Sequence, residues 1–282
     1  MSVVAIARPR ALTPALQAVL AAAVLASPWF GWPHLDSRLL TTALLYGIAA
    51  SGLNLMFGYA GMLSLGSAMF IGTGAYTVTI GVQHGHWPVL VAVGAGLAIS
   101  AIAAFLLALI LVRLSGHYFG VATLGLAMAF SGLMIALPNL TGGGSGMTIS
   151  RRLNLGFVTV ASDLQWYALA VATTACMLLV LRWIVAGKRG RILRLIRQDE
   201  LSASVLGVPV YWAKVAVFVA GSLFVAIGGS LLVLWQGVVV PETVGVIPSV
   251  QFIALVVIGG AGYRLGGFIG ALLILWLQAV LS

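Results

Sequence analysis

Residues that could carry acid–base, metal or nucleophilic chemistry are scarce in this sequence, and they do not converge. The acidic residues and histidines all fall in loops or at the ends of apolar segments: Asp36, Asp163, Asp199, Glu200 and Glu242, with His34, His84, His86 and His117. A proton relay or a coupling-ion site would need ionisable groups inside those segments. We therefore expect no catalytic site, no cofactor and no metal site, and any energy for function must enter from elsewhere. The single cysteine, Cys176, is expected to be a small core residue.

One hydrophilic stretch between apolar segments could do more than connect them. It runs from Gly187 to Lys214 and reads GKRGRILRLIRQDELSASVLGVPVYWAK. Apolar residues at helical spacing predict a short amphipathic helix, which continues past the acidic pair and ends at the turn Gly207–Pro209.

Two interpretations of that helix are open. It could lie on the membrane surface, where its opening basic residues would meet anionic headgroups. The acidic pair Asp199–Glu200, followed by small residues and a Gly-Val-Pro turn, is more typical of a shaped contact with a soluble protein. The pattern favours docking.

The elements that must position this stretch are membrane helices. The chain is 62% hydrophobic and 7% charged, whereas soluble domains carry roughly 25% charged residues. Since a spanning helix needs about 20 apolar residues, the uncharged runs predict about nine membrane segments. They are 14–32, 39–57, 62–82, 88–112, 117–137, 164–186, 213–239, 249–262 and 265–282. The eighth is short enough to be re-entrant or broken.

The sequence thus predicts an all-α, polytopic transmembrane protein forming a single domain over residues 1–282, with 188–213 as its cytoplasmic coupling segment. Alternating the segments from a cytoplasmic N-terminus places most basic residues inside: Arg8, Arg10, Arg113, Arg182, Lys188, Arg189, Arg191, Arg194, Arg197, Lys214 and Arg264. The outside set is Arg38, Arg151 and Arg152. This bias follows the positive-inside rule, so the net charge of +9 reports orientation and not nucleic-acid binding.

A glycine-rich region from Gly52 to Tyr76 has two interpretations of similar weight. Its glycines could serve only close helix packing. Alternatively, broken helices could line a pathway for a small polar solute. In that case the lining would be Asn54, Tyr59, Ser64, Ser67, Thr73 and Tyr76.

Several blocks together resemble a known family, the permeases of branched-chain amino-acid ABC transporters. They are GLNLMFGYAGMLSLGSAMFIGTGAYT (52–77), RLSGHYFGVATLGLA (113–127), TGGGSGM (141–147), GRILRLIRQDELSASVLGV (190–208) and VIGGAGYRLGGFIGA (257–271). One departure is Ser67, where the family often has histidine after Ser-Leu-Gly.

The resemblance implies a permease subunit that carries branched-chain or related amino acids across the bacterial inner membrane. Its implied partners are a second permease subunit, cytoplasmic ATP-binding subunits, a periplasmic solute-binding protein and the lipid bilayer. ATP would be hydrolysed on a separate chain, and this chain would not be an enzyme. The ATPase-coupling residues would be Arg197, Glu200, Ser202, Ala203 and Gly207. The alternative is an ion-coupled secondary transporter or facilitator of a small polar solute.

Overall fold

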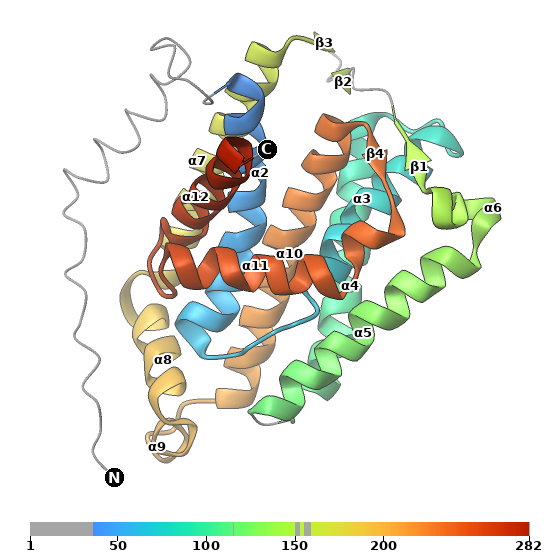
Figure 1. Cartoon of the computed structure of the whole chain (residues 1–282). Helices are drawn as coiled ribbons and strands as arrows, with labels where there is room; N and C mark the ends of the chain where they lie inside the picture. The colour runs from blue at the N-terminus through green and yellow to red at the C-terminus, as the bar shows by residue number, and fades with distance from the viewer. Residues whose placement is uncertain (1–35, 115, 150–152, 155–158, 282) are drawn as a thin grey trace.

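The chain folds as a bundle of apolar helices (Figure 1). This computed structural model describes residues 36–281 except 115, 150–152 and 155–158. Among these described residues, five helical segments are long and apolar enough to cross a membrane. They are α2 (Ser37–Asn54) continued by the π-helix η2 (Leu55–Tyr59), α4 (Val89–Leu111), α5 (His117–Ala136), α7 (Asp163–Val185) and α10 (Val210–Gln236). The all-α prediction is confirmed, whereas the count of about nine segments is not.

Three further apolar helices are shorter. They are α3 (Ser67–Gln83), α11 (Val246–Gly259) and α12 (Gly266–Leu281). Helix α11 lies across the other helices and not along them (Figure 1), as expected of a short, broken element. The expected first segment, 14–32, lies outside the described residues.

The centre of the bundle is formed by α2, α3 and α10. The most apolar windows of α2 and α10 are 78% buried, against 22% for α4 and α7. Glycines permit this close packing: a Cβ on Gly52 would overlap the carbonyl oxygen of Gly221, and one on Gly229 would overlap that of Ile71. Small residues let helix backbones approach where hydrophobic force alone cannot hold helices together in lipid.

One end of the bundle carries short strands and turns. Strand β1 (Met147–Thr148) pairs antiparallel with β4 (Val238–Val239), and β2 (Leu153–Asn154) pairs with β3 (Thr159–Val160). The turns α6 (Pro138–Thr141), η3 (Gly143–Ser145) and η4 (Pro241–Val244) complete this end.

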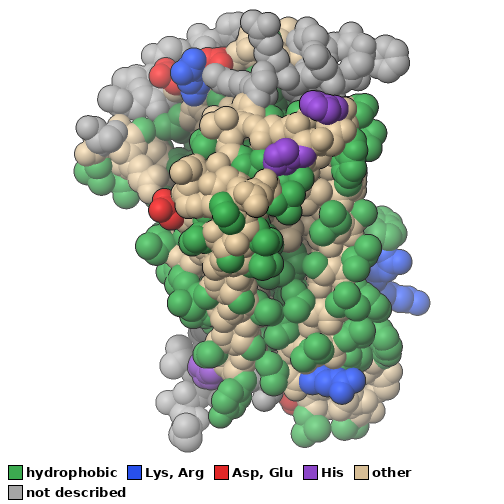
Figure 2. All heavy atoms as spheres, turned by 90° about the vertical axis from the view of Figure 1, so that its right-hand side faces the viewer, with side chains coloured by type: hydrophobic (Ala, Val, Ile, Leu, Met, Phe, Trp, Pro, Cys, Tyr) green, Lys and Arg blue, Asp and Glu red, His purple; other side chains and the backbone are tan. Residues whose placement is uncertain are grey.

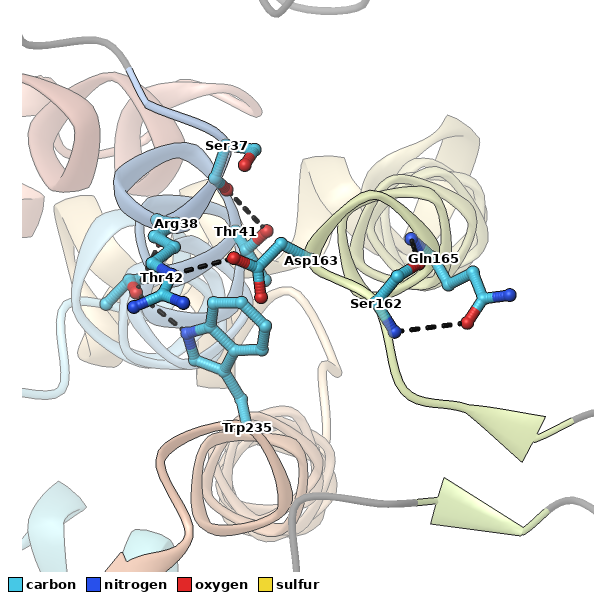
Figure 3. Close-up of polar contacts among 8 residues, drawn as sticks. All are labelled: Ser37, Arg38, Thr41, Thr42, Ser162, Asp163, Gln165 and Trp235. Carbon is cyan, nitrogen blue, oxygen red and sulfur yellow. Dashed lines mark hydrogen bonds and ion pairs between the residues drawn. The ribbon is translucent and has the colours of Figure 1, made fainter.

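Polar contacts join α2 to α7 and to α10 at the same end (Figure 3). Arg38 Nε donates to Asp163 Oδ2 at 2.7 Å, joining the first turns of α2 and α7, and Trp235 Nε1 on α10 donates to Thr42 Oγ1 at 3.0 Å. Helices α8 (Gly187–Gln198) and α9 (Glu200–Val205) lie at the opposite end (Figure 1). Arg38 and the basic residues of α8 are therefore at opposite ends, as the charge count predicts.

The side of the bundle that α4 and α5 cover is largely hydrophobic, with few charged side chains (Figure 2). The outer face of α7 is also apolar, with Leu179 and Trp183 exposed, and this helix corrects one expectation. Cys176 is exposed and not in the core. Helix α7 is peripheral, and its near-uniform apolarity gives the sequence no sign of which face is buried.

Candidate coupling site

Helix α8 is amphipathic because its apolar residues recur on one face. Gly190, Leu193 and Ile196 are buried, while the basic side chains between them are exposed. A Cβ on Gly190 would overlap the carbonyl oxygen of Val185, so α8 starts in direct contact with the end of α7. The helix thus lies against the bundle and presents its charge outward.

The expected single amphipathic helix is in fact two helices, broken at Asp199. Asp199 is in an extended conformation (φ −159°, ψ 112°), and its side chain caps α9. Its carboxylate accepts the amide N–H of Leu201 at 2.9 Å and the hydroxyl of Ser202. The Ser202 hydroxyl, followed by the amides of Leu201 and Ser202, lowers the pKa of Asp199 below its usual 3.8. Asp at an N-cap competes with helix continuation, which is why the break falls there.

Helix α9 ends in a Schellman motif at Gly207. The amide of Val208 donates to Ala203 O at 3.1 Å, and the amide of Gly207 donates to Ser204 O at 3.0 Å. Gly207 has φ +78°, a left-handed conformation that favours glycine. The predicted turn is confirmed, and a six-residue helix is closed at both ends by its own sequence.

Two long side chains connect this segment to the membrane helices. Lys214 on α10, whose side chain is only 9% exposed, pairs with the carboxylate of Glu200. Arg197 Nη1 donates to the carbonyl oxygen of Gly58 in η2. A cavity of about 200 Å³ lies beside the Glu200–Lys214 pair and is also lined by His117 at the start of α5.

Large apolar side chains are exposed on α9 and at its C-terminal end, beside the exposed Ser202 and Ser204. Leu201, Val205 and Leu206 are 74%, 80% and 71% exposed, while Ala203 on the inner face is fully buried. Leu201 and Val205 are four positions apart and therefore share one side of α9, and Leu206 follows directly as its C-cap residue. Four of the predicted coupling residues make contacts that hold the segment around α9 in place: Arg197, Glu200, Ser202 and Gly207. The fifth, Ala203, packs on the buried side of the helix. Their role in coupling remains a prediction.

The six predicted pathway residues are all buried. Asn54 ends α2 and bridges to the loop before α12: its Oδ1 accepts the amide of Gly262 at 2.8 Å, and its Nδ2 donates to Tyr263 O at 2.5 Å. Tyr59 ends η2. Ser64 lies in the segment between η2 and α3.

The other three pathway residues lie on α3. The Thr73 hydroxyl accepts from Ser100 Oγ at 3.0 Å and donates to Phe70 O at 3.1 Å. Within the described part of the chain, the hydroxyls of Ser64, Ser67 and Tyr76 have no hydrogen-bond partner. None of the six lines the cavity beside Glu200 and Lys214 or a second cavity near α11. That they line a pathway stays a prediction.

A second cavity, of about 340 Å³, contains polar residues that the sequence did not single out as a site. Gln236, Glu242 and Gln251 line it, near β4, η4 and α11. Glu242 is a single acidic residue between two long uncharged runs, and this isolation could have marked it as a candidate site residue in the sequence.

The fold defines a multi-pass, all-α membrane protein with a short, capped helix in the loop at one end. The chain belongs to the family described as branched-chain amino acid transport system / permease component, whose model matches residues 37–282. It is therefore related to transport components and not to enzymes.

Two curated relatives support this placement. The high-affinity branched-chain amino acid transport system permease protein LivM of Escherichia coli (strain K12) is 28% identical over 274 residues, covering 86% of this chain and 64% of that protein. Its namesake in Salmonella typhimurium (strain LT2) is 29% identical over the same coverage. This chain thus spans about 64% of the length of these relatives. No solved structure matches the chain significantly.

Proposed function

We propose that this chain is the membrane-spanning permease subunit of an ATP-driven importer of branched-chain or related amino acids in the bacterial inner membrane. Its N-terminus lies in the cytoplasm. It works with a second permease subunit, cytoplasmic ATP-binding subunits and a periplasmic solute-binding protein. Family membership and the names of the two relatives support the substrate class.

The observation that carries the proposal is the construction of α9. An exposed apolar face on a six-residue helix in a charged loop is unstable in water unless something holds it. Here Asp199 caps its start, Gly207 closes its end and Lys214 ties it to α10. A soluble partner could bind these exposed, rigidly held apolar side chains in a hydrophobic groove.

The mechanism follows from this contact between α9 and the partner subunit. ATP binding closes the partner subunits, α9 moves with them, and the two permeases pass between outward-open and inward-open arrangements. Arg197 and Lys214 carry the motion to η2 and α10, because each joins the loop to a membrane helix. The chemistry of ATP hydrolysis stays on the partner.

Co-purification in mild detergent followed by reconstitution tests the proposal. A second permease and an ATP-hydrolysing subunit should accompany the chain, and amino-acid uptake into vesicles should require ATP. The variant Gly207→Trp should leave assembly intact and abolish ATP-dependent uptake, whereas Gly125→Trp on the open surface of α5 should not. A chain that purifies alone and transports without ATP would instead be an ion-coupled transporter or facilitator.

A further inference from the structure

The cavity of about 340 Å³ at the end opposite α9 has the size of a small-molecule site. Ligand pockets range from about 300 to 1,000 Å³, so this one suits a single small solute. Its walls come from α2, α3, α10, β4, η4 and α11, which places it where the central helices meet the crossing helix (Figure 1). Six elements therefore contribute to one hollow.

The single acidic residue of the cavity favours a ligand with a cationic group. Among its lining residues Glu242 is the only acidic or basic one. The amide side chains of Gln236 and Gln251 line the same space and can each donate or accept. A carboxylate with two amides offers an acceptor for an ammonium and donors for a carboxylate, the two groups of an α-amino acid.

Most of the remaining wall is apolar or aromatic. Tyr46 and Phe252 stack with ring centroids 5.4 Å apart and an interplanar angle of 9°. Both rings line the cavity together with Ile247 and Leu232. Such walls would receive a branched aliphatic side chain and would offer a polar side chain few partners.

The turn that carries Glu242 is held in place. Val244 in the same turn is fully buried, and a Cβ on Gly72 of α3 would meet its Cγ1 at 2.6 Å. The Ser131 hydroxyl of α5 donates to Pro241 O at 3.0 Å. Because η4 is fixed by α3 and α5, the carboxylate is presented without a large ordering cost on binding.

We propose that this cavity is an amino-acid binding subsite, in which Glu242 receives the α-ammonium group and the amides of Gln236 and Gln251 face the carboxylate. The proposal rests on the proposed function for its substrate class. It assigns specificity for an amino group to a residue outside the predicted pathway set. The amide side chains of Gln236 on α10 and Gln251 on α11 then bind the carboxylate of the amino acid.

Thiol labelling tests occupancy directly. In the full chain carrying Cys176→Ser, which removes the only native cysteine, Thr243→Cys places a thiol on the cavity wall beside Glu242. L-Leucine should slow its reaction with a maleimide. Leucine that lacks its amino group (isocaproate) should protect more weakly, and leucine that lacks its carboxylate (isoamylamine) should show how far the ammonium alone suffices.

The variant Glu242→Gln should raise the half-protecting concentration of leucine by about tenfold or more, the loss expected for a hydrogen bond to a charged group. It should leave protection by isocaproate unchanged, and Glu242→Asp should lose less than Glu242→Gln. The matched control is Asp36→Asn, since Asp36 is an exposed acid at the start of α2 that does not line the cavity. Size-exclusion elution checks that each variant stays folded.

The outcomes separate this subsite from the importer proposal. Absence of leucine protection, or equal half-protecting concentrations in the Glu242→Gln and Asp36→Asn variants, overturns the subsite. ATP-dependent uptake alongside that result would leave the importer proposal standing. Protection that depends on Glu242 together with ATP-independent uptake would support the subsite and remove the ATP-driven mechanism.

Discussion

Replacing Gly207 by alanine should loosen the end of α9 without creating a steric clash. At φ +78° an L-residue is strained, and the left-handed conformation costs about 1–2 kcal/mol. No atom lies within 4 Å of the position that a Cβ would occupy, so the backbone conformation is the whole source of the effect. The bonds at risk are those of the Schellman motif to Ala203 and Ser204.

Hydrogen exchange of the amides at positions 207 and 208 measures this loosening. A cost of about 1–2 kcal/mol corresponds to a population change of roughly 5–30-fold, so these amides should exchange faster by that factor if they open locally. Gly207→Asn should change exchange less, because asparagine tolerates the left-handed region. Gly125→Ala, in the middle of α5 with open space around it, is the matched control.

One comparison would refute this reasoning. If Gly207→Ala and Gly125→Ala gave the same exchange rates across α9, the positive φ of Gly207 would not hold the motif closed. Helix α9 would then be positioned by its contacts with α10 alone, and the caps would be incidental.

Three further changes have defined outcomes. Asn54→Leu should lower the free energy of unfolding by about 1–3 kcal/mol for each backbone group left unpaired, measured by thermal denaturation in detergent. Because the folded-state pKa of Asp199 is lowered, its stabilisation of α9 is present above about pH 3.8 and lost as pH falls through the folded pKa; Asp199→Asn should remove this pH dependence of α9 amide protection. Gly270→Ala should destabilise by about 1–3 kcal/mol where Gly125→Ala does not, since its Cβ would overlap Leu255 O and push α12 from α11.

The helices of this bundle could be predicted because their signal is local. An uncharged apolar run favours a helix whatever it packs against, and the described apolar helices start and end within about five residues of the expected segments. Of these described helices, five are long enough to span a membrane. The break at Asp199 was missed for the opposite reason. The apolar spacing of α8 continues into α9, and only the competition between the Asp199 side chain and the helix backbone decides that the chain turns there.

The two cavities could not be predicted because they depend on which elements meet. Gln236, Glu242 and Gln251 show no common spacing in the sequence, and they line one cavity only because α11 lies across α10. Conversely, Asn54 has the side chain of a solute ligand, yet in the described structure it satisfies backbone groups at Gly262 and Tyr263. The residue type shows that Asn54 can form hydrogen bonds, but the packing of the helices determines which groups it bonds.

Helix α10 is the element that connects the two ends of this molecule. Its first turns carry Lys214, which is paired with Glu200 of the loop helix, and its last residue, Gln236, lines the opposite cavity. The helix has 27 residues, so at 1.5 Å per residue it extends about 40 Å. A continuous α-helix resists stretching, since each turn is closed by its own hydrogen bonds. A displacement of α9 that pulls on Lys214 must therefore either move Gln236 at the wall of the opposite cavity or first break the Glu200–Lys214 ion pair.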